Sequence, residues 1–198
     1  MTLAPPSILA GAAIALSLAC FASFSWAIPT HFHKHGAMPA GMRVIAGLGL
    51  VGYAWMAWLL VMFPASAPRL ILALVMMAFS LALFWAAISA TRTARLTLAY
   101  SADLPQRLVR AGPYRFVRHP FYSAYILFWL AGWVASGQEA YAIVPTVMFL
   151  LYLRAARMEE GKFASTELAP EYAAYRVSAG MFLPRFGRRA IAHSEEKA

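Results

Sequence analysis

The sequence predicts an all-α integral membrane protein with about five transmembrane helices and a helical C-terminal cap on the cytoplasmic side. Of its 198 residues, 62% are hydrophobic and only 13% are charged, whereas a water-soluble domain carries roughly 25% charged residues. The charged residues are also clustered rather than spread along the chain. Lipid is therefore the expected main solvent, and residues 1–198 are expected to form a single membrane domain.

Five apolar segments approach or reach the length of about 20 residues that a helix needs to cross the hydrocarbon layer. They span residues 7–27, 44–63, 70–91, 121–138 and 140–153. We expect the first to be a retained helix, because it lacks the basic segment that begins a signal peptide. The fifth is short and contains Pro145, but it follows the fourth closely as a hairpin and continues without a breaker into Arg154.

The distribution of basic residues predicts the orientation, because cytoplasmic loops of membrane proteins are enriched in Lys and Arg. With five spans, all of the seventeen basic residues except Arg69 fall on one side. We therefore expect a protein of the inner, cytoplasmic membrane, with its N-terminus outside and its C-terminus in the cytoplasm. Cytoplasmic retention and contact with anionic lipids explain the net charge of +9, so no nucleic-acid partner is expected.

The richest polar stretch precedes the fourth span. Its candidate binding residues are Gly112, Pro113, Tyr114, Arg118, His119, Pro120 and Tyr122. Pro120 suits the first turn of a helix, where its missing N–H is tolerated. The free N–H groups of that helix start, beside Arg118 and His119, predict a site for a carboxylate or phosphate. Tyr114 and Tyr122 could stack on a purine or donate a hydroxyl, although simple anchoring at the lipid head groups is an equal alternative.

A second polar stretch follows the fifth span, from Arg154 to Glu160. Its adjacent carboxylates, Glu159 and Glu160, face different directions on a helix, so one can point into the bundle while the other meets solvent or an arginine. Arg157 is three residues before Glu160, and the two can pair along one face. A carboxylate can accept hydrogen bonds from ribose hydroxyls or balance a cationic ligand, and an arginine can hold a carboxylate. The alternative is a solvated helix of mixed charge.

Together the two stretches resemble the isoprenylcysteine carboxyl methyltransferase family, whose pattern phospholipid N-methyltransferases share. The resemblance also includes the apolar hairpin between them, the segment Glu-Tyr-Ala-Ala-Tyr-Arg-Val at 171–177 and the final Leu183-Pro184. It implies a membrane bundle that binds S-adenosylmethionine on the cytoplasmic side, through elements at residues 108–122 and 154–184. The chain departs from the family at Ser123-Ala124, where a glycine is common, and at 177–179, where a proline is common.

The resemblance also implies roles for individual residues. The cofactor would contact Gly112, Pro113, Tyr114, Arg118, His119, Pro120, Tyr122, Glu159 and Glu160. Arg154 and Glu159 would lie near the reacting acceptor, and Arg157 is a second arginine that could position it. The implied activity is methyl transfer to a lipophilic acceptor, either an isoprenylcysteine-like carboxylate, a phospholipid amine or a small hydrophobic molecule. The expected partners are therefore this lipid or lipidated substrate and the membrane lipids.

Other hypotheses remain open from the sequence. Membrane sterol reductases resemble this family in their C-terminal half and use NADPH, whose phosphates would need several arginines. A non-enzymatic protein would use the basic turn and tail only for anchoring to lipid. His31, His33 and His35 share one face if extended and imidazole binds metals well, but no carboxylate or cysteine lies nearby. We therefore expect a polar loop there and no metal site.

Overall fold

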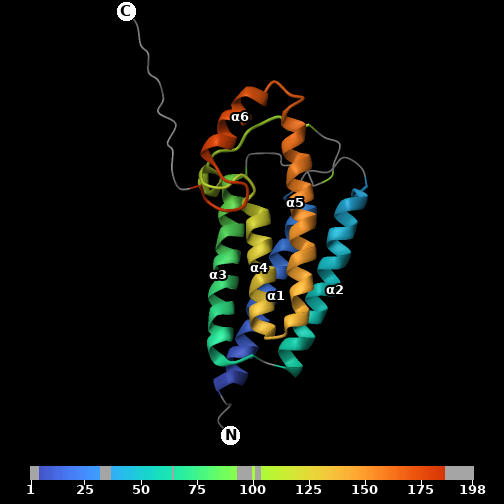
Figure 1. Ribbon diagram of the computed structural model, residues 1–198, viewed down its shortest axis with the longest axis vertical. Coiled ribbons are helices and arrows are strands. Elements are labelled where there is room, and N and C mark those ends of the chain that lie inside the picture. Colours follow the sequence, from blue (N-terminus) through green and yellow to red (C-terminus); the bar gives the residue numbers. More distant parts are fainter. Residues whose placement is uncertain (1–4, 32–36, 64, 93–99, 101–103, 186–198) are drawn as a thin grey trace, which may run out of the picture.

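The computed structural model describes residues 5–31, 37–63, 65–92, 100 and 104–185. Within these ranges the chain is all-helical, and its one β-type contact is an isolated parallel bridge between Val117 and Gly180. Five long helices run side by side as a bundle, and a sixth, shorter helix lies across one end (Figure 1). The bundle helices are α1 (Pro5–Thr30), α2 (Ala40–Met62), α3 (Ala67–Ala90), α4 (Pro120–Ser136) and α5 (Ile143–Phe163).

Four of these helices are long and apolar enough to cross a membrane by themselves. The qualifying segments are Ile8–Thr30, Ala40–Met62, Ala67–Ala90 and Glu139–Phe163. The last includes a short 3₁₀-helix, η2 (Glu139–Ala142), that joins α4 to α5. The protein is therefore a multi-pass membrane protein, and the apolar segments recognised in the sequence correspond to its helices.

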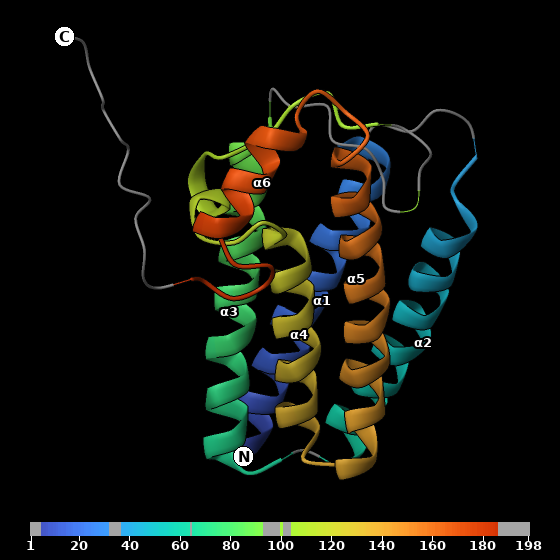
Figure 2. The ribbon, with the colours of Figure 1, turned by 45° about the horizontal axis from the view of Figure 1, so that its top comes forward.

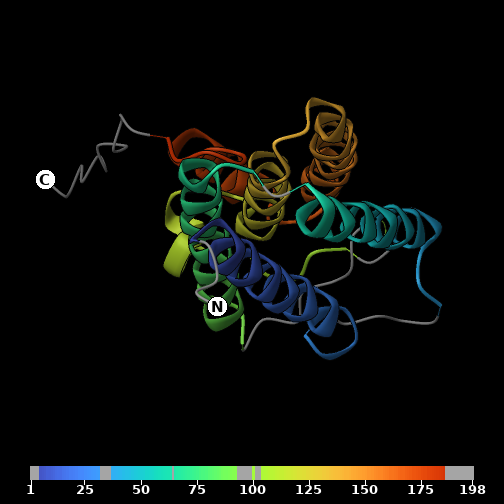
Figure 3. The ribbon, with the colours of Figure 1, turned by 90° about the horizontal axis from the view of Figure 1, so that it is seen from below.

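Helix α4 is the shortest of the bundle and lies at its centre. It has 17 residues, which gives a length of about 26 Å, slightly less than the roughly 30 Å of hydrocarbon. It ends at Ser136, two residues before the predicted boundary, because Gly137 takes a left-handed conformation with φ 64°. Viewed along the bundle, α4 lies between α3 and α5, with α1 on the side away from α5 (Figures 2 and 3). The Ser80 hydroxyl of α3 donates a hydrogen bond to the Ala124 carbonyl, 2.7 Å away.

Helix α5 extends past the predicted span as one continuous helix, as the absence of a breaker after residue 153 indicates. Pro145 lies in its first turn, where a proline does not interrupt hydrogen bonding. From the sequence, a helix that leaves the fifth span is expected to break near Ala169-Pro170. The helix already ends at Phe163, and Pro170 instead lies in the first turn of α6 (Ala169–Ser178).

Helix α6 is held against the bundle by a small aromatic cluster of its own. The Tyr172 ring stacks on Phe163 at the end of α5, with centroids 4.1 Å apart and planes 5° apart. The buried Tyr175 hydroxyl donates to the carbonyl of Tyr114, 2.6 Å away, and burial raises the pKa of this hydroxyl to about 12. The sequence also predicts a second short helix through residues 171–177 after that break. This segment lies in α6, which ties the end of α5 to the loop before α4.

Candidate functional site

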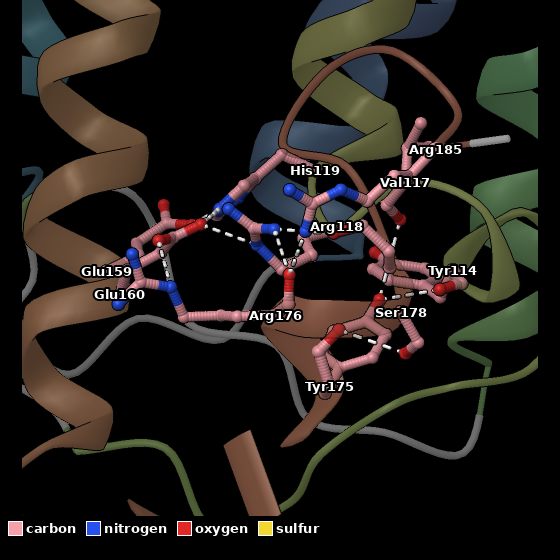
Figure 4. Close-up of polar contacts among 11 residues, drawn as sticks. Tyr114, Val117, Arg118, His119, Glu159, Glu160, Tyr175, Arg176, Ser178 and Arg185 are labelled. Carbon is pink, nitrogen blue, oxygen red and sulfur yellow. Dashed lines mark hydrogen bonds and ion pairs between the residues drawn. The ribbon is translucent and has the colours of Figure 1, made fainter. Parts of the chain in front are cut away.

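Three segments that are distant in the sequence meet at one end of the bundle. They are the loop before α4, which includes the 3₁₀-helix η1 (Gly112–Arg115), the last turns of α5, and the segment from α6 to Phe182. Figure 4 shows Glu159 and Glu160 projecting from α5 toward Arg118 and His119 of the loop, with Arg176 of α6 beside them. The two polar stretches singled out in the sequence are therefore in direct contact.

Glu160 is the centre of this group. Its Oε1 accepts a hydrogen bond from Arg118 Nε at 2.8 Å and lies 3.1 Å from His119 Nε2, while its Oε2 lies 3.5 Å from Arg176 Nε. The side chains of Glu160, Arg118 and His119 are only 7%, 8% and 9% exposed. The Arg118 and His119 side chains, beside the start of α4, are thus both engaged by a carboxylate of the chain itself.

Glu159 is held differently and is more open. Its Oε1 accepts a 2.5 Å hydrogen bond from the Tyr122 hydroxyl, and its Oε2 lies 3.5 Å from His119 Nδ1. Its side chain is 29% exposed, so it is the carboxylate of the pair that a ligand can reach. The Tyr122 ring stacks against His119 on one side and Tyr152 of α5 on the other, with centroids 5.6 and 5.5 Å away.

His119 bridges the two carboxylates through its two ring nitrogens. Burial by itself lowers the pKa of an imidazole, but hydrogen bonds and charge interactions with Glu159 and Glu160 outweigh burial and raise the pKa of His119 above 6.5. An imidazolium satisfies both acceptors because each of its nitrogens carries a hydrogen. His119 therefore bridges both carboxylates, and they favour its protonated form.

This assignment predicts how stability changes with pH. Because the pKa of His119 is higher in the folded than in the unfolded state, its contribution is complete below about pH 6.5 and is lost as the pH rises through the folded-state value. The melting temperature in detergent should fall as the pH is raised from about 6 to 9. His119→Gln should flatten this dependence, and an unchanged pH slope in the variant would contradict the bridging imidazolium.

The segment after α6 fixes the backbone of the Arg118–His119 turn. The N–H groups of Arg118 and His119 donate to the carbonyls of Gly180 and Met181 at 2.7 and 3.1 Å. Arg118 Nη1 also donates to the Ala179 carbonyl, and Ser123 Oγ donates to the Phe182 carbonyl at 2.7 Å. The C-terminal segment therefore determines how the turn presents its cationic side chains to α5.

Gly180 is the position in this segment that tolerates no side chain, because an added Cβ would overlap the backbone carbonyl of Leu183. Gly180→Ala should destabilise the protein by about 1–3 kcal/mol, the usual cost of overpacking. Gly161→Ala is the matched control, since its Cβ would meet nothing within 4 Å in α5 and alanine favours a helix. Equal melting temperatures for the two variants would show that the C-terminal segment is not docked as described.

The remaining predicted residues of the turn before α4 shape its backbone or pack against the bundle. Gly112 has φ 56°, and its added Cβ would lie 3.0 Å from Ala90 of α3. The Tyr114 ring is buried in a core cluster with Phe84 and Phe121. Pro113 belongs to η1, and Pro120 is the first residue of α4, as predicted.

Within the described residues, the two arginines of the second stretch form no ion pair with Glu159 or Glu160. Arg154 and Arg157 are both exposed on α5. The expected pairing of Arg157 with Glu160 is not formed in the described part of the chain, where the ion pairs of Glu160 are with Arg118, His119 and Arg176. Burial raises the pKa of Tyr100, and the nearby charge of Arg154 opposes this shift.

Some residues of the site were missed in the sequence. Ser123 attracted notice only as a departure from the family pattern, yet its hydroxyl binds the C-terminal segment. Arg176 and Tyr152 gave no distinguishing pattern, because a basic residue near a tyrosine motif and an aromatic residue in an apolar span are both common. Of the three histidines of the first loop, His33 and His35 lie outside the described residues, and His31 Nε2 is 2.9 Å from Thr91 Oγ1.

The bundle and its buried carboxylate–imidazolium–arginine group define a multi-pass membrane protein with a polar site at one end. A family model described as phospholipid methyltransferase matches residues 68–169, which is just over half of the chain. The chain therefore belongs to the phospholipid methyltransferase family, a family of membrane methyltransferases. A search of curated proteins gives no match. The family assignment favours methyl transfer over the reductase and anchoring alternatives.

Proposed function

We propose that the protein transfers a methyl group from S-adenosylmethionine to a lipophilic acceptor at the cytoplasmic face of the inner membrane. The observation that carries the proposal is the convergence of His119, just before α4, and the adjacent Glu159–Glu160 pair, at the end of α5, into one polar group. The basic residues at this end of the bundle support its cytoplasmic orientation. The C-terminal segment, packed on the same turn, supports a role as a cap over the site.

The chemistry of these side chains fits S-adenosylmethionine. The cofactor is cationic at its sulfonium and ammonium groups and has ribose hydroxyls, all of which suit a partly exposed carboxylate such as Glu159. The buried Tyr122 hydroxyl, which donates to Glu159 Oε1, holds that carboxylate in place. We therefore propose that Glu159 binds the cofactor directly, and that Tyr122 and His119 hold Glu159 for this contact.

The other residues of the predicted cofactor set are proposed to shape the site. Glu160 and Arg118 neutralise each other and hold His119, while Gly112, Pro113, Tyr114 and Pro120 set the path of the turn. When bound, S-adenosylmethionine supplies an already activated methyl group, so the protein's task is to orient the reactants and exclude water. A rigid, hydrogen-bonded group of this kind provides such orientation.

The acceptor is proposed to reach the site from lipid along α5, where Leu150 is 56% exposed. If the acceptor is an amine, Glu159 is the better placed base, because Glu160 is already paired with three cationic side chains. If it is a carboxylate, no base is required, and the exposed Arg154 or Arg157 would position it. Both cases use the same buried His119 bridge.

Transfer of labelled methyl groups tests this proposal. Purified protein in lipid nanodiscs should move label from methyl-labelled S-adenosylmethionine into a lipid extract, and the labelled product identifies the acceptor class. Glu167→Gln, a change at an exposed residue of the turn before α6, should transfer at the wild-type rate. Absence of labelled product from every lipid fraction, with folded wild-type protein, would contradict the proposal.

A further inference from the structure

Three large apolar side chains are exposed where the η1 loop and the C-terminal segment cross. Phe116, Val177 and Leu183 are 54%, 58% and 79% exposed. We call these three residues the crossing patch. Exposed apolar residues are expected on the lipid-facing sides of the bundle helices, but these lie outside the candidate spans, in segments that otherwise carry the polar site.

The backbone holds the crossing patch together. Gly180 N–H donates to the Phe116 carbonyl at 3.0 Å, and the backbone of Leu183 packs so closely on Gly180 that no Cβ fits between them. Arg185 Nη1 donates to the carbonyl of Val177 at 3.1 Å. The three apolar side chains are therefore presented from a hydrogen-bonded structure rather than from loose chain ends.

The η1 loop, which ends beside Phe116 of the crossing patch, lies against the end of α3. The η1 loop packs on the last turn of that helix, since an added Cβ at Gly112 would meet Ala90 Cβ at 3.0 Å and the Ala86 carbonyl at 3.8 Å. Figures 1 and 2 show the crossing of loop and C-terminal segment beside the upper end of α3. The same end of α3 carries Trp85, which is 40% exposed, and exposed tryptophans are enriched at membrane interfaces.

Basic side chains flank the crossing patch. Arg115 and Arg185 are both exposed, and the Arg115 guanidinium lies over the Phe116 ring, 5.9 Å from its centroid. Apolar side chains interspersed with arginines match the boundary between acyl chains and anionic head groups. A soluble protein partner would not require the patch to lie level with the end of a membrane helix.

We propose that the crossing patch is an interfacial anchor, seated in the head-group layer of an anionic bilayer. Phe116, Val177 and Leu183 enter the acyl boundary, while Arg115 and Arg185 contact lipid phosphates. The anchor fixes the C-terminal segment to the membrane on one side while its backbone holds the Arg118–His119 turn on the other. This inference concerns the membrane surface and does not depend on methyl transfer.

Site-directed fluorescence quenching tests the anchor. In a Cys20→Ala background, a small fluorophore is attached to Leu183→Cys, to Phe116→Cys or, as the control, to Ser165→Cys, an exposed position in the turn between α5 and α6. Each protein is placed in nanodiscs of phosphatidylcholine with or without phosphatidylglycerol. Fluorophores at 183 and 116 should be quenched several-fold more by spin-labelled lipid than by aqueous iodide, with the reverse at 165.

The contribution of anionic lipid and of Arg115 to the anchoring of the crossing patch is measured in the same samples. Lipid quenching at position 183 should increase with the phosphatidylglycerol fraction, and Arg115→Gln should weaken that increase. Iodide quenching at 183 as strong as at 165 would overturn the proposal, because the patch would then face water. Protection of 183 from both quenchers would also overturn it, because the patch would then be covered by protein, such as a second copy of the chain.

Discussion

Glu160→Ala is expected to lower the free energy of unfolding by about 3–5 kcal/mol, the loss typical when one partner of a buried ion pair is removed. The reason is that Arg118, only 8% exposed, would keep a buried charge without the carboxylate that it and the buried His119 both contact. Denaturant unfolding in detergent micelles, followed by the fluorescence of the six tryptophans, measures this change.

The matched control is Glu171→Ala. Glu171 pairs with Arg110 at 3.2 Å, but both side chains are about half exposed, and exposed pairs contribute about 0–1 kcal/mol. A Glu160→Ala variant that is no less stable than Glu171→Ala would show that the buried group is not formed. Glu160→Gln should fall between the two, because the amide can still accept a hydrogen bond from Arg118 Nε.

Glu159→Gln is expected to affect activity more than stability. The amide keeps the shape of the side chain and can still accept the Tyr122 hydroxyl, but it removes the negative charge that faces the proposed cofactor and any amine acceptor. We expect methyl transfer to fall by about 100-fold or more, the range of a lost acid–base or charge-stabilising group. Initial rates with labelled S-adenosylmethionine, at fixed protein concentration in nanodiscs, measure the effect.

Tyr122→Phe separates the effect of holding the Glu159 carboxylate in position from the effect of its negative charge. It removes the 2.5 Å hydrogen bond to Glu159 but leaves the carboxylate, so its loss of activity should be smaller than that of Glu159→Gln. Full activity in Glu159→Gln, with the melting temperature of the wild type, would exclude Glu159 from the chemistry and move the acceptor site elsewhere on the bundle.

The helices could be predicted because each is determined by the residues of its own segment. Apolar runs of spanning length have few alternatives in lipid, where every backbone polar group must be satisfied within the segment. Pro120 at the start of α4 follows from the same local reasoning. The end of α5 could not be placed, because Phe163 ends that helix through its stacking on Tyr172, a contact between separate helices.

In the candidate site, too, features set by the local sequence could be predicted, and contacts between separate segments could not. The residue types at His119, Glu159 and Glu160 indicated polar chemistry at the right end of the bundle, and these side chains are in contact. The sequence could not show that the Arg118 guanidinium forms an ion pair with Glu160, or that the Tyr114 ring packs in the core. Both contacts depend on which side of the turn meets α5. The docking of Gly180 on the turn is likewise a long-range backbone contact, for which a single glycine gives little indication.

The binding of S-adenosylmethionine to the purified protein tests the central claim most directly. Equilibrium dialysis in nanodiscs should show saturable binding to the wild type and to Gly161→Ala. His119→Ala, which removes the bridge between the two glutamates, should weaken binding by at least about tenfold, equivalent to about 1.4 kcal/mol. Folded wild-type protein that binds no S-adenosylmethionine, or a His119→Ala variant that binds it as tightly as the wild type, would contradict the account.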